Sequence, residues 1–263
     1  MTQTPGRLSG KKALVTGASR GIGRAIALRL AAEGAVLACG VRKLEDGESL
    51  VAEIAAAGGT GVAVVLDVAD GASVATGVER AARPERRVDI VVNNAGLAGQ
   101  TPLDGDERSD RAFERIFDVN VTGTWRVLRA VLPFLAEGGR IVNLSSVSGR
   151  FGVPGQAGYC GAKHAVIGMT RALALELAPR KVTVNAVCPG WVDTEMGRYG
   201  IRGYGKAMGL TEEEALAAAG KMAPLGQVLV PQEVAGLVAW LVSEDARNVT
   251  GQSIVIDGGQ VMP

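Results

Sequence analysis

Short runs of aliphatic and β-branched residues alternate along the whole chain with longer segments rich in Ala, Leu and Arg. Seven of these runs predict β-strands, at residues 13–16, 36–41, 61–66, 88–93, 140–145, 181–187 and 253–256. The runs are hydrophobic throughout, which is typical of parallel strands buried on both faces. Helical segments between them supply the crossovers that parallel strands need. We therefore predict an α/β fold, a single doubly wound domain of about seven parallel strands with helices on both faces.

No linker or repeat interrupts this rhythm, so residues 1–263 are predicted to form one domain. One region departs from it, because glycines and tyrosines, including Tyr199 and Tyr204, follow one another closely between residues 197 and 220. Within this region, residues 211–214 (Thr-Glu-Glu-Glu) are typical of a capping box that opens a short helix. We predict a mobile, glycine-rich lid over residues 194–222, with an ordinary surface excursion as the alternative.

Composition excludes several classes of protein. Lys+Arg 28 against Asp+Glu 27 leaves a net charge of +1, so no basic surface typical of nucleic-acid binding is expected. No apolar run is long enough to span a membrane, and the first twelve residues lack the apolar core of a signal peptide. The three cysteines are odd in number and far apart, and no His/Cys cluster suits a metal. We expect a cytoplasmic protein without a metal.

A glycine-rich turn, Thr16-Gly-Ala-Ser-Arg-Gly-Ile-Gly23, joins the first predicted strand to the first predicted helix. Glycines at 17, 21 and 23 allow unusual backbone angles and a close approach of the main chain to a pyrophosphate. The negative charge of a pyrophosphate also favours the amino terminus of a helix. A simple tight turn is the alternative, but the position between strand and helix favours a dinucleotide site.

The residues after the second strand indicate which dinucleotide binds. A carboxylate there would hold the ribose diol of NAD, but the strand is followed by Arg42 and no acid. Arg42, together with Arg20 in the glycine turn, can bind a 2′-phosphate through paired hydrogen bonds. Either arginine alone could be a solvated surface charge, whereas both together favour NADP(H). Asp67 and Val68 follow the third strand and suit the adenine edge.

A phenol and an ammonium group, Tyr159 and Lys163, lie four residues apart. In a helix this spacing puts both on one face, where the ammonium would stabilise the phenolate and lower the phenol pKa. The loop after Ser146 can bring its hydroxyl alongside them. With a bound hydride carrier, these groups form a redox site in which the phenol exchanges a proton with a carbonyl oxygen. The alternative is a surface pair on an amphipathic helix. The lone His164 has no acidic partner for a triad.

These motifs, in this order, resemble those of the short-chain dehydrogenase/reductase family over nearly the whole chain, from Gly10 to Gly259. The matching segments are TGASRGIG (16–23), NNAG (93–96), the serine thirteen residues before the tyrosine, YxxxK (159–163) and Pro189-Gly190. Within the family, the chain looks most like NADPH-dependent β-ketoacyl reductases and the ketoreductases of aromatic polyketide synthesis.

The resemblance implies a Rossmann-type domain and a set of functional residues. Tyr159 would be the acid or base, Lys163 its electrostatic partner and Ser146 the hydroxyl that orients the carbonyl. Asn120, in the middle of a predicted helix, would be the fourth member, as a proton relay through water to Lys163. A buried amide bonded to a main-chain carbonyl is the alternative, and the two roles are compatible. The cofactor-binding residues from motif and resemblance are Gly17, Ser19, Arg20, Gly21, Ile22, Gly23, Arg42, Asp67, Val68, Asn93, Ala95, Gly96, Tyr159, Lys163, Pro189, Gly190, Val192 and Thr194.

We therefore expect NADPH-dependent reduction of a ketone to a secondary alcohol. An NAD-dependent secondary-alcohol dehydrogenase and a catalytically silent nucleotide-binding regulator are the alternatives. The predicted substrate-lining residues are mostly apolar or aromatic: Leu97, Val147, Phe151, Val153, Trp191, Tyr199 and Tyr204. They favour a medium-sized apolar or acyl-chain ketone, free or on an acyl carrier. The resemblance also implies a homotetramer, with interfaces around residues 113–135, 157–177 and the last strand.

Overall fold

The computed structural model describes residues 6–262, so residues 1–5 and 263 of the predicted domain lie outside the described residues. Within this range one sheet has the strand order β3-β2-β1-β4-β5-β6-β7, and every neighbouring pair is parallel. The strands are β1 (Lys12–Thr16), β2 (Val36–Val41), β3 (Thr60–Val65), β4 (Val88–Asn93), β5 (Leu135–Leu144), β6 (Thr183–Pro189) and β7 (Ser253–Ile256). The predicted doubly wound α/β fold is confirmed.

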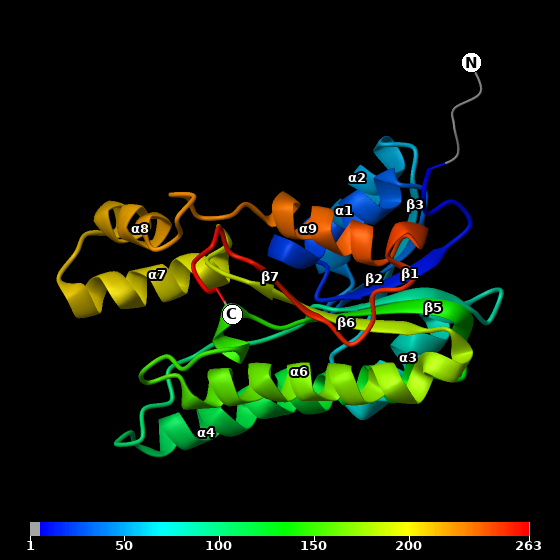
Figure 1. The fold of residues 1–263 in the computed structure, drawn as a ribbon. Helices are drawn as coiled ribbons and strands as arrows, with labels where there is room; N and C mark the ends of the chain where they lie inside the picture. The colour runs from blue at the N-terminus through cyan, green and yellow to red at the C-terminus, as the bar shows by residue number, and fades with distance from the viewer. Residues whose placement is uncertain (1–5, 263) are drawn as a thin grey trace.

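Helices cover both faces of this sheet (Figure 1). One face carries α1 (Gly21–Ala32), α2 (Glu45–Ala56) and α9 (Pro231–Leu241). The other face carries α3 (Gly71–Ala82), α4 (Glu107–Phe117), α5 (Gly123–Val131) and α6 (Ala157–Leu177). Each face has its own apolar core, so side chains such as Leu30 and Leu50 fill one layer while Val78 and Val127 fill the other. Burial on both sides explains why the strands are hydrophobic throughout.

The region predicted as a glycine-rich lid is built from two helices. It forms α7 (Glu195–Met208) and α8 (Glu212–Lys221), a hairpin that projects beyond the sheet (Figure 1). A Cβ atom on Gly205 would lie 2.6 Å from the Cβ of Ala215, so this glycine allows the two helices to approach closely. The predicted capping box is confirmed, because Thr211 N donates to Glu214 Oε2 at 2.8 Å and Glu214 N to Thr211 Oγ1 at 3.3 Å.

Short helical turns complete the chain. A π-helical turn, Asp118–Thr122, joins α4 to α5, and 3₁₀ turns span Val147–Gly149, Ala178–Arg180 and Glu244–Ala246. The π-helical turn contains Asn120, predicted to lie in a regular helix, and such turns often mark functional sites. Among residues 6–262, no helix combines the length and apolar character needed to cross a bilayer.

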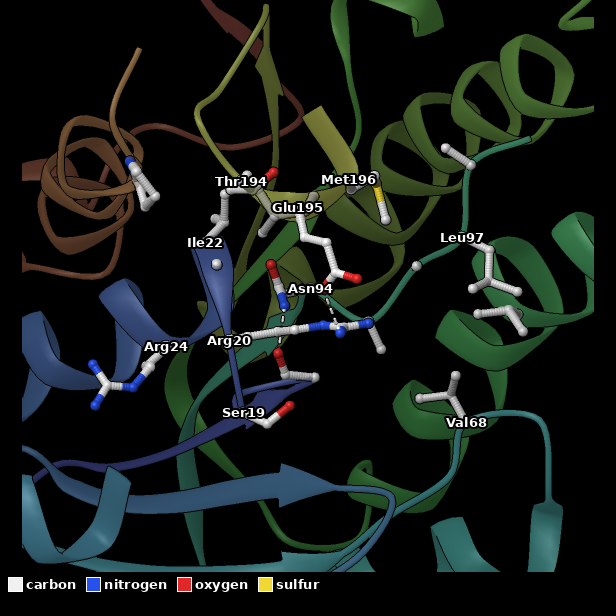
Figure 2. Close-up of a pocket in the computed structure, with 18 of the residues that line it drawn as sticks. Ser19, Arg20, Ile22, Arg24, Val68, Asn94, Leu97, Thr194, Glu195 and Met196 are labelled. Carbon is white, nitrogen blue, oxygen red and sulfur yellow. Dashed lines mark hydrogen bonds and ion pairs between the residues drawn. The ribbon is translucent and has the colours of Figure 1, made fainter. Parts of the chain in front are cut away.

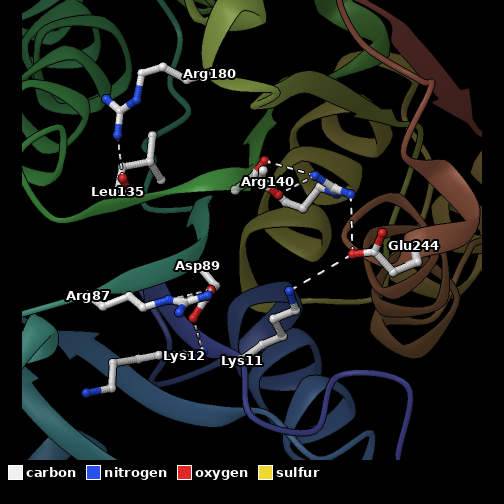
Figure 3. A network of polar contacts seen from close by, with 10 residues as sticks. Lys11, Lys12, Arg87, Asp89, Leu135, Arg140, Arg180 and Glu244 are labelled. Atoms are coloured by element: carbon white, nitrogen blue, oxygen red, sulfur yellow. Dashed lines mark hydrogen bonds and ion pairs between the residues drawn. The ribbon is translucent and has the colours of Figure 1, made fainter. Parts of the chain in front are cut away.

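The two edges of the sheet differ in character. The carboxyl ends of the strands open onto a cleft, part of which is drawn in Figure 2. The amino ends are tied together by charged side chains (Figure 3). There the Asp89 carboxylate accepts hydrogen bonds from Lys12 N and Arg87 Nε, both at 2.9 Å, while the buried Arg140 lies 3.5 Å from Glu244. This network fixes the edge opposite to the cleft.

Candidate functional site

A cleft of about 860 Å³ lies at the carboxyl ends of the strands. Its walls come from the turns after β1, β2, β3 and β4, from the start of α7 and from α6. In doubly wound sheets, ligands bind at this edge, where the strand order reverses on either side of the first strand. Here the reversal lies between β1 and β4.

The glycine turn forms one wall of the cleft and is held in place by Asn94 and Ala95, which follow β4. Gly17 and Gly21 have positive φ angles of 64° and 56°, which favour glycine. A Cβ atom on Gly17 would lie 2.9 Å from the Cα of Ala95, so no larger residue fits there. The Asn94 amide donates to the carbonyl oxygens of Thr16 and Gly17, both at 3.0 Å. Asn94 was not among the predicted site residues, although it lies within the NNAG motif.

Most of the predicted cofactor-binding residues line the cleft. These are Gly17, Ser19, Arg20, Gly21, Ile22, Arg42, Asp67, Val68, Ala95, Gly96, Tyr159, Lys163, Pro189 and Thr194.

The other four predicted cofactor-binding residues lie behind the cleft wall. A Cβ atom on Gly23 would lie 2.3 Å from the Gly17 carbonyl oxygen, and one on Gly190 2.7 Å from the Asp257 side chain. The buried Asn93 amide donates to Asn143 Oδ1 at 2.9 Å, and Val192 is buried. Gly23, Gly190 and Val192 therefore contribute to the packing behind the wall, and Asn93 contributes a hydrogen bond to the neighbouring strand.

The two predicted phosphate-binding arginines line the cleft, and one of them is already paired. Arg20 Nη1 lies 2.6 Å from Glu195 Oε2, at the first residue of α7 (Figure 2). Arg42 follows β2 and is exposed. Sequence reasoning missed Glu195 because this contact joins residues 175 positions apart. It also missed Asp46, a carboxylate in the first turn of α2 that lines the same cleft.

Tyr159 and Lys163 lie on one face of α6, as their spacing predicts, and both line the cleft. Lys163 Nζ lies 5.6 Å from the Tyr159 ring centroid and donates to the Leu144 carbonyl oxygen at 2.8 Å. Burial lowers the pKa of Lys163 from 10.5 to about 8.

The pKa of Tyr159 is raised, chiefly by burial, while its interaction with the Ser146 side chain lowers it. The expected lowering by the ammonium group is therefore wrong in direction. Removal of the phenolate from water outweighs the neighbouring cation, which is bonded to the main chain of β5.

The remaining two predicted catalytic residues are buried and are not part of the cleft wall. Ser146 interacts with the Tyr159 side chain, and Asn120 Oδ1 and Lys163 Nζ would lie 3.2 Å and 3.6 Å from a Cβ atom on Gly96. Ser146 Oγ accepts a hydrogen bond from Ser148 N at 3.1 Å, which leaves the hydroxyl proton free to donate. Asn120 Oδ1 accepts from Leu97 N at 2.7 Å and Asn120 Nδ2 donates to Leu97 O at 2.8 Å. The interpretation of Asn120 as a buried amide bonded to the main chain is confirmed.

Ser145 is a further residue of the site that was not among the predicted ones. It lines the cleft, and its Oγ donates to the Lys163 carbonyl oxygen at 3.0 Å. Two consecutive residues, Leu144 and Ser145, thus hold the side chain and the main chain of Lys163.

The predicted substrate-lining residues are only partly brought together. Leu97 and Tyr199 line the cleft, while Val147, Phe151, Val153, Trp191 and Tyr204 are absent from its wall. Trp191 packs instead against the apolar core of the α7–α8 hairpin, which contains Ile201 and Ala215. Met196 and Arg202 of α7 line the cleft and were not predicted, because their inward direction depends on the unpredicted helix.

Comparisons with known proteins agree with this geometry. A family model described as enoyl-(acyl carrier protein) reductase matches residues 17–260. A Streptomyces virginiae protein named as a candidate ketoacyl reductase of the monensin polyketide synthase is 41% identical over 263 residues, covering 98% of each chain. A 3-oxoacyl-(acyl carrier protein) reductase of Thermotoga maritima is 38% identical over 258 residues, covering 97% of this chain and 100% of that protein.

A solved structure extends the agreement to three dimensions. The crystal structure of a dehydrogenase/reductase from Sinorhizobium meliloti has a TM-score of 0.86 and 36% identity, covering 97% of this chain and 96% of that one. Sequence and fold thus match over almost the whole length. On these grounds the chain belongs to the short-chain dehydrogenase/reductase family of nicotinamide-dependent oxidoreductases.

Proposed function

We propose that the protein is an NADPH-dependent reductase that converts a ketone to a secondary alcohol, with Tyr159 as the proton donor. The observation that carries the proposal is the meeting of Tyr159, Lys163 and the glycine turn in one cleft. The ketoacyl reductase names of two relatives support the same class of reaction.

The residues present fit a nicotinamide dinucleotide. Gly17 and Gly21 line the cleft at the amino end of α1, where the helix favours the negative charge of a pyrophosphate. Arg20 and Arg42 would hold a 2′-phosphate, and Asp67 with Val68 would contact the adenine. A bound reduced nicotinamide supplies the hydride that the carbonyl carbon receives.

The protein supplies the proton and the hydrogen bonds around the carbonyl oxygen. The Tyr159 phenol, with a pKa above 10.0, is protonated near neutral pH, the form that donates a proton during reduction. Ser146 uses its free hydroxyl proton to stabilise the negative charge that develops on the oxygen. Lys163 has two further N–H groups beyond the one on Leu144, and these would bind the cofactor ribose and take part in proton relay.

The chemical class of substrate follows from the wall opposite the glycine turn. Leu97, Met196 and Tyr199 present apolar surface, which suits an acyl-chain or other medium-sized ketone, free or on an acyl carrier. The exposed Phe113, Trp125 and Leu175 lie on α4, α5 and α6, where a homotetramer would bury them. Sedimentation of the purified protein tests that assembly.

The test of the function is Tyr159→Phe, assayed with a panel of ketones and 3-oxoacyl thioesters. We expect turnover to fall at least about 100-fold, because a positioned acid contributes a factor of this order or more, while NADPH affinity stays near that of the wild type. An enoyl thioester in the same panel separates ketone reduction from double-bond reduction. Near-normal turnover of the variant would remove Tyr159 as the acid.

A further inference from the structure

We propose that Glu195 sets the cofactor selectivity of the cleft by competing with the 2′-phosphate of NADP(H) for Arg20. This inference rests on the proposed role of Arg20 as a phosphate ligand. Glu195 is a positioning residue in this scheme, because it acts through Arg20 and makes no contact of its own with the cofactor.

The contact spans two walls of the cleft. Arg20 is the residue immediately before α1, and Glu195 is the first residue of α7 (Figure 2). Both line the cleft, and the 2.6 Å between Arg20 Nη1 and Glu195 Oε2 is that of a charge-assisted hydrogen bond. The two walls also abut without these side chains, because a Cβ atom on Gly21 would lie 3.3 Å from Thr194 Cγ2. The glycine turn and α7 therefore remain adjacent when the pair is broken.

The competition affects only a cofactor with a 2′-phosphate. A guanidinium group bonded to a carboxylate must release or share it before it holds a phosphate through two parallel hydrogen bonds. NADH makes no such demand on Arg20. The Glu195 carboxylate thus lowers the preference for NADPH below the value that Arg20 and Arg42 would give alone.

The size of the effect is set by exposure. The side chains of Arg20 and Glu195 are 70% and 71% exposed, so water and salt screen their attraction. Exposed ion pairs of this kind change an equilibrium by about twofold to fivefold. We expect a shift in the ratio of the two dissociation constants of this size.

A matched control exists on α3. Glu79 pairs with Arg83 at 2.8 Å, with side chains 49% and 67% exposed. Neither residue is part of the cleft wall. Glu79→Gln removes the same charge from a similar exposed pair, and so reports any effect of net charge alone.

The experiment measures NADPH and NADH binding by titration calorimetry in the full chain. We expect Glu195→Gln to raise the NADPH preference about twofold to fivefold, Glu79→Gln to leave it unchanged and Arg20→Ala to lower it. In the Arg20→Ala background, Glu195→Gln should have no further effect. Glu195→Ala and a melting curve for each variant guard against local misfolding.

Two failures are distinguishable. If Arg20→Ala lowers the NADPH preference but Glu195→Gln does not raise it, the competition is refuted and the proposed phosphate clamp stands. If Arg20→Ala leaves the preference unchanged, the role of Arg20 in the proposed function fails, and the competition fails with it. An equal gain in Glu79→Gln would also overturn the inference, because a general charge effect would then explain it.

Discussion

Replacement of Lys163 by Met should remove a pH dependence of stability that the wild type has. Lys163 is buried, and its pKa is lowered from 10.5 to about 8. A difference of this size means that the charged ammonium destabilises the folded protein by about 3 kcal/mol relative to the unfolded chain. Met has a similar length and carries no charge, so it removes this penalty. It also removes the bond to Leu144 O, at a cost of about 1 kcal/mol or more.

The sign of the pH dependence follows from the two pKa values. Below pH 8 the lysine is charged in both states and the full penalty applies, whereas above about pH 10.5 it is neutral in both and the penalty vanishes. Between pH 7 and pH 9.5 the penalty falls by about 2 kcal/mol, so the stability of the wild type rises by that amount relative to the Met variant. Tyr159 does not titrate in this range, because its pKa is raised above 10.0.

The assay is urea unfolding of wild type and Lys163→Met at equal protein concentration, followed by tryptophan fluorescence from pH 7 to pH 9.5. When the free energies of unfolding of the two proteins are subtracted, the contribution of titratable groups that both contain is removed. Lys206→Met, at an exposed lysine of α7, is the control and should show no such trend. A stability difference that stays constant to within about 0.5 kcal/mol across this range would refute the reasoning, since the lysine would then titrate alike in both states.

Two further variants test the walls of the cleft. Gly17→Ala should cost about 1–3 kcal/mol of stability and most of the cofactor affinity, because it combines a positive φ of 64° with a contact 2.9 Å from Ala95 Cα. Gly10→Ala shares the positive φ but meets no atom within 4 Å, so calorimetry on the pair separates backbone strain from steric overlap. Asn120→Ala should cost about 1–3 kcal/mol in thermal unfolding, because Leu97 loses the partners of both its N–H and its carbonyl; an unchanged melting temperature would contradict this.

The sheet could be predicted because its strands are buried on both faces. The runs at Val36–Val41 and Val88–Asn93 have the predicted bounds, because they are mostly apolar and nearly all of their residues are buried. The fifth strand begins at Leu135, five residues before the predicted start at residue 140. The prediction missed these residues because they include Gly138 and Gly139, and two consecutive glycines are typical of a loop.

The substrate side of the cleft could not be predicted to the same degree. Glycines of α7 were interpreted as sources of mobility, whereas Gly205 and Gly200 allow close contact with Ala215 and Trp191. A glycine signals either role, and only the packing partner distinguishes them. The lowered pKa of Lys163 and the pairing of Arg20 likewise depend on groups distant in sequence.

The α7–α8 hairpin has a small apolar centre of its own, built from Ile201, Ala215 and Ala219 against Trp191. The two large cores on either side of the sheet contain none of these residues. Replacements at Met196 or Tyr199 therefore alter the reaction chamber without disturbing the scaffold beneath it. Because the hairpin packs separately, substitutions in it would change which substrate the cleft binds, while the glycine turn, Tyr159 and Lys163 stay in place.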